Sequence, residues 1–447
     1  MDERKQYPKL TIHHLGPIQD CEMIVNDFTV FVGPQSQGKS TIAKAVYFFR
    51  SVKGDIIDLM LRGLPLAKRY AQSSWDNMLD AILTDKFSGF FDDSFCRDDT
   101  VLRYDYTKDI WIRVSITQDD TPVGVITLPK LEFSDMISAY LASLDKTNPK
   151  ASHPLSPRDK TEYENALNAL FHDDYAPIYI PAGRHLTTLL SSQLNYVLTS
   201  MNDAQRLSMD YLTIDYIERI LRLRPLFEGS LGPVITRRET ANARIRTLLY
   251  IMLRSAKILG GKYRSVNGAE NLVLPNETLI PLRHASSGQQ EAVWPLNLMF
   301  YYLLEEKKTF LVFEEPESNL YPDSQRTMGE LLALFRNAGN QVMVTTHSPY
   351  LLGTFNYLLM GSQCESAGLA DGLRETLEKE YQLTPDYWLS PGRTDAYFVS
   401  GGGMENAVTD ADGVRMIRNE LIDAVSEDIN AVSDLFLGKL YHWDDEE

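Results

Sequence analysis

The sequence predicts an α/β fold in which a core sheet flanked by helices is joined to an antiparallel N-terminal β subdomain and a helical insertion. Three observations lead to this prediction. Short apolar strands run directly into helical patterns near residues 28–51 and again near 309–352. Residues 100–130 alternate between apolar and polar side chains, as the strands of an antiparallel meander do. Helical patterns then dominate from about residue 160 to about residue 258.

The first elements are three short strands, KLTIHHL, CEMIV and FTVFV, predicted within residues 9–32. A helix is expected at 39–51, because its apolar residues fall on one side. Residues 55–84 also have a helical pattern, and 87–96 is expected to be a loop before the meander.

The later elements follow from the same patterns. In chain order we expect a mobile loop at 146–160, a strand within 176–184, a helix opening at 284–296, a strand at 309–313, a helix at 323–337, a strand at 341–345, a helix starting within 346–352 and a final helix at about 413–440.

Composition places the chain among ordinary globular proteins of the cytoplasm. Of its 447 residues, 44% are hydrophobic and 23% are charged. An apolar run of about 18 residues, which a membrane helix requires, is missing, and the charged N-terminus does not read as a signal peptide. Three widely spaced cysteines match no metal-binding pattern and indicate free thiols in a reducing compartment.

Charge is unevenly distributed along the chain. The net charge is −17, yet residues 219–264 contain eleven basic and two acidic residues. Such a block either binds an anion such as the DNA backbone or pairs with acids on other elements. The sequence leaves three partners open for it: DNA, a DNA-mimicking acidic protein, or acids within the assembly.

The segment GPQSQGKS, residues 33–40, matches the phosphate-binding pattern G-x-x-x-x-G-K-[ST] between a strand and a helix. Backbone N–H groups of such a loop and the helix N-terminus form a nest for anions. Lys39 is expected to reach the β- and γ-phosphates, and Ser40 is expected to bind Mg²⁺. The candidate nucleotide-binding residues are Gly33, Pro34, Gln35, Ser36, Gln37, Gly38, Lys39, Ser40 and Thr41.

Two adjacent acids close the apolar strand in LVFEEPESNLYP, residues 311–322. A phosphate-binding loop requires a carboxylate at the end of a neighbouring strand to hold Mg²⁺, and Glu314 occupies that position. A second acid can activate the water that attacks the γ-phosphate, and Glu315 is the candidate base.

Two weaker motifs complete the set. Ser287, Gly288 and Gln289 begin a predicted helix and would form a second phosphate-binding end. One nucleotide does not need two phosphate-binding helix ends from the same chain. The helix end at Ser287 is therefore expected to complete the nucleotide site of another copy. His347 follows a strand and can hydrogen-bond the γ-phosphate.

The four motifs, in this order, resemble those of ATP-binding-cassette (ABC) ATPases, and more narrowly the RecF/SMC/OLD-like group known as AAA-15 or AAA-21. GPQSQGKST resembles the Walker A motif, LVFEEPESNLYP the Walker B motif and D-loop, ASSGQQE the signature, and VMVTTHSPYLL the switch-histidine segment. YIPAGR, residues 179–184, resembles a segment that precedes the signature in this group. Gln35, Gln37, Glu314 and Tyr321 depart from the commonest residues without removing a required charge.

This resemblance implies an ABC-ATPase head of the RecF/SMC type that hydrolyses ATP with Mg²⁺ in head-to-tail dimers or higher homo-oligomers. It divides the chain into an ATP-binding lobe at 1–130, a locally basic helical insertion at 131–260, a lobe with the signature, Walker B motif and switch histidine at 261–363, and a partner-binding region at 364–447. Without a membrane segment, no membrane partner is expected.

Three roles remain open for such an ATPase. The chain resembles the ATPase subunit of PARIS-type anti-phage defence systems, which implies a sensor or scaffold that holds and releases a separate TOPRIM-like effector nuclease. The alternative is a RecF-like repair ATPase that clamps DNA with the basic block, and less favoured is the ATPase subunit of an ABC transporter. The chain itself is not expected to be a nuclease, because Asp410 and Asp412 are interpreted as part of a turn before the final helix.

Overall fold

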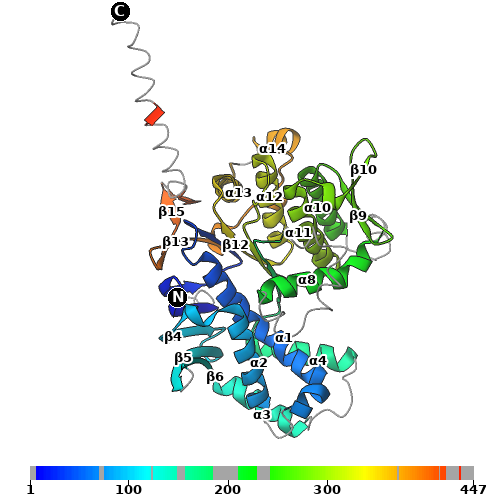
Figure 1. The fold of residues 1–447 in the computed structure, drawn as a ribbon. Helices are drawn as coiled ribbons and strands as arrows, with labels where there is room; N and C mark the ends of the chain where they lie inside the picture. Colours follow the sequence, from blue (N-terminus) through cyan, green and yellow to red (C-terminus); the bar gives the residue numbers. More distant parts are fainter. Residues whose placement is uncertain are drawn as a thin grey trace, which may run out of the picture.

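Five parallel strands and one antiparallel edge strand form the core sheet of the computed structural model (Figure 1). The structure describes residues 7–69, 75–121, 124–147, 157–184, 210–228, 242–369, 372–411, 413–418 and 432–433. The strand order is β14 (Gly403–Asn406), β13 (Thr394–Ser400), β3 (Phe28–Val32), β12 (Gln341–Thr346), β11 (Thr309–Glu314) and β7 (Ala176–Ile180). All pairs are parallel except β13 with β14. The carboxyl ends of β3, β11 and β12 therefore meet at one edge of the sheet.

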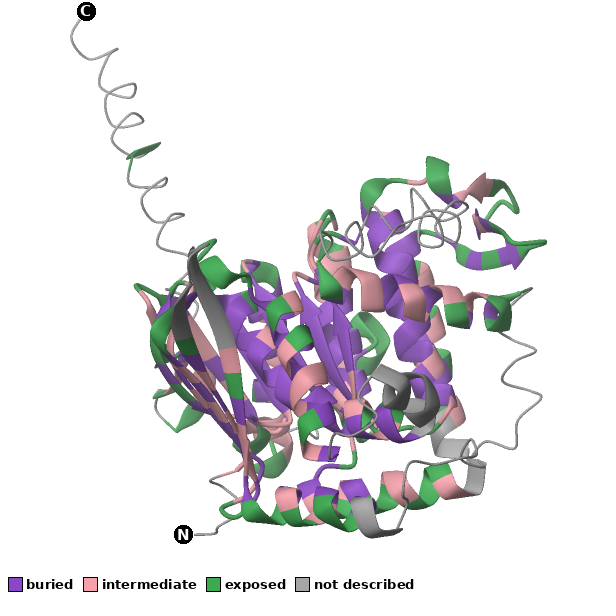
Figure 2. Ribbon diagram, turned by 60° about the horizontal axis from the view of Figure 1, so that its bottom comes forward, coloured by how far each residue is buried: buried purple, intermediate pink, exposed green. Residues whose placement is uncertain are grey.

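Helices cover both faces of this sheet, which explains why its strands read as continuous apolar runs. Leu311 and Phe313 of β11 pack on one face, whereas Phe310 and Val312 pack on the other. The first face is covered by α8 (Tyr211–Leu223), α10 (Asn242–Leu259), α11 (Ser287–Leu304), α12 (Pro322–Asn337) and α13 (Pro349–Ser366). The second face is covered mainly by α1 (Lys39–Arg69). Figure 2 shows the buried sheet between the two layers.

The N-terminal β subdomain packs against α1 and forms one continuous hydrophobic core with it. Its five antiparallel strands are ordered β2 (Ile18–Ile24), β1 (Lys9–Leu15), β4 (Cys96–Asp105), β5 (Trp111–Thr121) and β6 (Gly124–Phe133). Three helices lie beside it: α2 (Trp75–Phe90), α3 (Asp135–Thr147) and α4 (Pro157–Phe171). Smaller elements are the sheet of β8 (Lys262–Val266), β9 (Ala269–Val273) and β10 (Leu279–Pro281), the helix α14 (Arg374–Tyr381), and the hairpin of β15 (Val408–Ala411) and β16 (Val414–Ile417).

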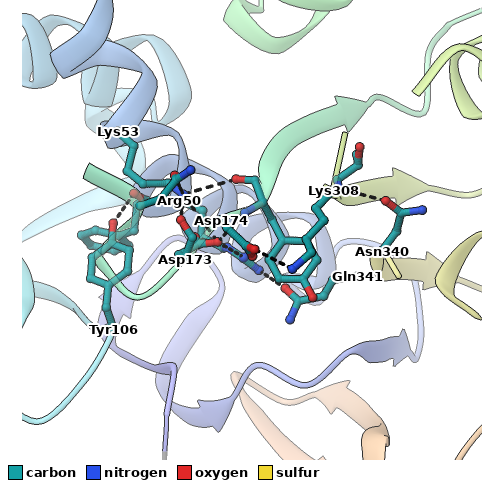
Figure 3. A network of polar contacts seen from close by, with 12 residues as sticks. Arg50, Lys53, Tyr106, Asp173, Asp174, Lys308, Asn340 and Gln341 are labelled. Carbon is teal, nitrogen blue, oxygen red and sulfur yellow. Dashed lines mark hydrogen bonds and ion pairs between the residues drawn. The ribbon is translucent and has the colours of Figure 1, made fainter. Parts of the chain in front are cut away.

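A buried ion network fixes α1 to the amino-terminal edge of the core sheet (Figure 3). Arg50 of α1 donates to both carboxylate oxygens of Asp173, at 3.0 and 2.7 Å, and to Gln341 at 2.6 Å. Lys53 lies 3.6 Å from the same carboxylate. Because Asp173 and Gln341 lie just before β7 and at the start of β12, this network sets the position of α1 relative to the strands whose opposite ends carry the motifs.

The predicted α/β architecture, with its core sheet, N-terminal antiparallel subdomain and helical insertion, is confirmed. Residues 87–90 were expected in a loop but complete α2, because Phe87 and Phe90 are buried in the N-terminal core. The mobile loop predicted at 146–160 falls largely on residues 148–156, outside the described residues, and 157–160 begin α4. Within the described residues, every helix is too short or too polar to cross a membrane.

The C-terminal region differs most from its prediction. β13, from the segment expected to bind partners, pairs with β3 inside the core sheet. The predicted start of a helix at 413 is wrong, because Val414–Ile417 form β16 and pair with β15. Asp410 therefore lies in a strand rather than in a turn before a helix. The rest of the expected helix, apart from 432–433, lies outside the described residues.

Candidate nucleotide-binding site

The loop 33–38 connects β3 to α1 and forms one wall of a cavity of about 480 Å³. The predicted residues that line the cavity are Gln35, Ser36, Gln37, Gly38, Lys39, Ser40 and Thr41. Pro17 and Phe95 of the N-terminal subdomain contribute to the wall, as do Glu315, Thr345 and His347 at the ends of β11 and β12. The structure thus brings the phosphate-binding loop, the candidate base and the candidate histidine together in one cavity.

Two glycines of the loop are required by its backbone. Gly33 and Gly38 have φ angles of +139° and +101°, which residues with a side chain rarely adopt. A Cβ atom on Gly33 would lie 2.3 Å from the carbonyl oxygen of Val399 in β13. β13 therefore does more than extend the sheet: it packs directly against the start of the phosphate-binding loop.

The Lys39 ammonium group is held within its own loop. It donates hydrogen bonds to the carbonyl oxygens of Gly33 at 2.8 Å and Pro34 at 2.6 Å. Burial lowers the pKa of Lys39 to about 8, and the nearby carboxylates Glu315 and Glu317 oppose this shift. An entering phosphate would replace the two carbonyl acceptors and favour the charged form.

The lowered pKa of Lys39 gives an expected pH dependence of ATP binding. A lysine is charged below its pKa, so ATP affinity should be highest below about pH 8 and fall by up to about tenfold per pH unit above it. Fluorescence titration with an ATP analogue from about pH 7 to about pH 10 would measure this. Lys39→Arg, which stays charged throughout, is the control. A flat affinity profile for the unmodified chain would contradict this role of Lys39.

Glu315 and His347 lie close together in the wall of the cavity. The His347 Nε2 atom lies 3.7 Å from Glu315 Oε1. Glu315 has a φ of +43° and its side chain is 39% exposed, so solvent water reaches its carboxylate. Burial and the charge of Lys39 lower the pKa of His347, which favours the neutral imidazole in the nucleotide-free site.

Glu314 lies on the α1 face of the sheet, the face that also carries Lys39 and Ser40, but its carboxylate is already engaged. It accepts hydrogen bonds from the Tyr179 hydroxyl at 2.7 Å and from the Ala182 N–H at 3.1 Å. The side chain is buried and does not line the cavity. Holding Mg²⁺ at Ser40 would therefore require a water bridge or a rotation of the Glu314 side chain.

Glu317, for which the sequence predicts no role, positions the segment that contains His347. Its buried carboxylate accepts from the Thr346 hydroxyl and from the His347 N–H, both at 2.7 Å. Burial raises the pKa of Glu317. The third acid of LVFEEPESNLYP was a signal for this role, since a buried acid in such a loop must find donors.

Arg184, at the end of YIPAGR, is the other residue whose position was not foreseen. The guanidinium group is buried and donates to the carbonyl oxygens of Glu314 and Glu315, each at 2.9 Å. It also lies 3.7 Å from the carboxylate of Glu291 in α11. Glu291 in turn accepts from Asn319 Nδ2 at 2.8 Å. Arg184 thus links the end of β11 to the helix that carries the signature.

The signature residues lie at the start of α11, outside the cavity that contains Lys39. Ser286 is the N-cap, and Gln289 completes a capping box with it. Ser287 is exposed, whereas Gly288 is buried. A Cβ atom on Gly288 would lie 2.3 Å from the carbonyl oxygen of Asn319, so this position has no room for a side chain. The Gln289 side chain also donates to the carbonyl oxygen of Leu259, at 2.7 Å. The exposed Ser287, in contrast, is not part of the capping box.

The fold and the site together define a P-loop ATPase domain. Residues 28–353 match the family described as "AAA domain, putative AbiEii toxin, Type IV TA system". Since the match spans well over half of the chain, the protein belongs to this family, and the predicted membership of the AAA-21 group is confirmed.

Solved structures similar to this chain include SMC head domains. One is the SMC head domain from Thermotoga maritima, with 13% identity, a TM-score of 0.34, and coverage of 92% of this chain and 97% of that chain. Another is the Smc head domain with an extended coiled coil bound to the C-terminal domain of ScpA, derived from Pyrococcus furiosus, with 11% identity, a TM-score of 0.36, and coverage of 94% and 98%. No curated protein matches the chain by sequence.

Proposed function

We propose that two copies of the chain bind and hydrolyse ATP at composite sites. The observation that carries this proposal is that one cavity contains Lys39, Glu315 and His347, whereas Ser287 is exposed elsewhere on the same chain. In the composite site, Ser287 and Gly288 of one copy contact the γ-phosphate held by the other copy. The exposed Tyr321, whose relative exposure is 77%, lies next to Asn319 and supports a contact surface on the signature side.

Within each site, the residues have separate roles. The loop 33–41 binds the phosphates, and Ser40 with Glu314 would hold Mg²⁺, which neutralises the developing charge. Glu315 takes the proton of the attacking water, and neutral His347 hydrogen-bonds the γ-phosphate. The oxygen ligands present, one hydroxyl and one carboxylate, are those that Mg²⁺ prefers.

Ser287→Arg is expected to abolish hydrolysis but leave ATP binding to the single chain intact, because the bulky cation prevents closure over the partner's nucleotide. Phosphate release and ATP-analogue binding would measure the two properties. Ser143→Arg, at an exposed position on α3, is the control for an added surface charge.

Mixing Ser287→Arg with Lys39→Ala provides a sharper test of the composite site. Each heterodimer of the two inactive variants has one intact site and one site that lacks both residues, so turnover should return in proportion to the heterodimer formed. No recovery in a mixture that demonstrably forms heterodimers would contradict sites shared between copies.

We further propose that this ATPase is the sensor or scaffold of a bacterial anti-phage defence system that retains a separate toxic effector nuclease until a phage trigger arrives. The description of its family as a putative toxin of a type IV TA system supports a role in a two-component toxic system. The segment 364–447 supplies the edge strand β14 and the exposed helix α14, which offer surface outside the nucleotide site.

Co-expression with the product of the neighbouring gene would test this role. A small TOPRIM-like nuclease should co-purify with the chain, and its retention should differ between Glu315→Gln with ATP and Lys39→Ala. Phage plating on cells that carry the pair should show protection with the unmodified chain and none with Lys39→Ala. A neighbouring permease, or unchanged protection by Lys39→Ala, would contradict the proposal.

The alternative role is a RecF-like clamp that would bind DNA through the basic block. The ion pairs of this block weaken that alternative. Five of its cations pair with acids of the same chain: Arg219 with Asp215, Arg224 with Glu270, Arg246 with Asp386, Arg254 with Glu330 and Lys257 with Asp323. Arg237 and Arg238 lie outside the described residues. A salt titration of duplex DNA binding separates the two roles, since a clamp would lose affinity steeply with salt.

A further inference from the structure

Two consecutive histidines of β1, His13 and His14, gather with Asp99 of β4 on the N-terminal sheet. Each residue offers one atom that could bind a metal ion, an imidazole nitrogen or a carboxylate oxygen, and these three atoms all lie within 4.8 Å of one another. Consecutive side chains of a regular strand point to opposite faces. Here the register shifts between His13 and Leu15, and His14 has a φ of +48°. This bulge turns both imidazole rings to one side, with centroids 4.0 Å apart.

A hydrogen bond from a buried side chain fixes the backbone of the bulge. The hydroxyl of Thr100, which is fully buried, donates to the carbonyl oxygen of His14. The same hydroxyl accepts from the Arg97 N–H at 2.8 Å. Since Thr100 follows Asp99 directly, the residue that fixes the backbone of His14 also fixes the position of the acid beside it.

Each imidazole is oriented by a carboxylate. Asp20, the cross-strand neighbour of His13, lies 2.7 Å from His13 Nδ1. This contact leaves His13 Nε2 facing Asp99 Oδ2 at 4.0 Å. Asp99 Oδ2 also lies 2.6 Å from His14 Nδ1. A carboxylate bound to the far nitrogen of a histidine is the usual support of a metal-ligating imidazole.

We propose that His13, His14 and Asp99 bind one divalent transition-metal ion, with Zn²⁺ the best fit. Two imidazoles and one carboxylate suit Zn²⁺, whereas Mg²⁺ takes oxygen ligands. Zn²⁺ bonds of about 2.0–2.2 Å place tetrahedral ligand atoms about 3.4 Å apart. The distances of 2.6 and 4.0 Å lie on either side of this value, so small side-chain movements suffice. Solvent supplies the fourth ligand, because Asp99 and His13 are about half exposed.

A metal ion bound at this site would affect the mobility of residues that line the nucleotide cavity. The Gly16 N–H, two residues after His14, donates to the carbonyl oxygen of Phe95 at 2.7 Å. Phe95 and Pro17 both line the cavity. A metal ion that joins β1 to β4 would therefore rigidify the two adjoining segments that carry these residues, the turn after β1 and the short helix before β4. The metal site itself does not depend on the proposed ATPase cycle.

Zinc binding can be measured directly on the full chain, without an affinity tag, nucleotide or chelating buffer. Titration calorimetry with Zn²⁺ alone and elemental analysis after gel filtration should give one ion per chain with micromolar or tighter affinity. His13→Gln, His14→Asn and Asp99→Asn should each weaken binding at least tenfold, and Asp20→Asn should weaken it by about tenfold as an orienting residue does. His172→Asn, outside the cluster, should leave binding unchanged.

A second readout separates loss of the site from loss of the fold. Zn²⁺ should raise the melting temperature of the unmodified chain and of His172→Asn, but not that of Asp99→Asn. Without metal, the three proteins should melt alike. Unchanged zinc stoichiometry in the His13, His14 and Asp99 variants, or no binding by the unmodified chain at about 100 μM Zn²⁺, where a site of micromolar affinity would be saturated, would overturn the proposal.

Discussion

Replacement of Glu315 by glutamine is expected to lower ATPase turnover by about 10²–10⁴-fold, the usual contribution of a positioned general base, while leaving ATP binding intact. The carboxylate lines the nucleotide cavity and lies 3.7 Å from His347 Nε2, so an amide in its place keeps the shape of the site but cannot accept the proton of water. Steady-state phosphate release measures turnover, and light scattering after gel filtration should show an ATP-dependent dimer that accumulates.

Glu314→Gln is the matched comparison for this experiment. Glu314 is buried between Tyr179 and Ala182 and does not line the cavity, so its amide should raise the Mg²⁺ concentration needed for half-maximal activity rather than trap the ATP-bound dimer. Lys39→Ala, which cannot hold the phosphates, should give neither turnover nor dimer. Normal turnover by both glutamine variants would show that the two acids are assigned wrongly.

The fold was predictable wherever a pattern is local. β3 and α1 flank a recognisable loop, and β11 and β12 are short apolar runs that end in polar motifs. β13 was not predicted, because TDAYFVS has a weak pattern and its parallel neighbour β3 is more than 350 residues away in sequence. Its role becomes clear only in the sheet, where the carbonyl oxygen of Val399 excludes a side chain at Gly33.

The candidate site was predictable to the extent that motifs specify backbone geometry. Glycines, Lys39 and the position of Glu315 follow from the loop and the strand end. The partners of buried charges did not follow, because the sequence does not show where a side chain is directed. Glu314 bonds to Tyr179, and Glu317 holds the His347 segment, and the positions of the two acids in the sequence indicate neither contact.

Replacement of Arg184 by methionine is expected to have the second large effect, on both stability and turnover. Arg184 is 2% exposed, and its guanidinium group holds the carbonyl oxygens of Glu314 and Glu315 while facing Glu291. Removing one member of a buried ion pair typically costs about 3–5 kcal/mol. We expect a lower melting temperature and a loss of turnover of at least tenfold, because the backbone that carries Glu315 is no longer fixed.

A second variant distinguishes a positioning role of Arg184 from simple destabilisation. Arg184→Met combined with Glu291→Met removes both charges, so much of the lost stability should return, as it does when a buried pair is replaced by apolar side chains. Turnover should stay low, because the carbonyl oxygens of Glu314 and Glu315 still lack their donor. Recovery of turnover together with the melting temperature would show that Arg184 contributes stability alone. Low turnover at restored stability would instead mean that YIPAGR is part of the catalytic apparatus. In the proposed composite sites, Arg184 would then join the candidate base of one site to α11, whose signature end would serve the other.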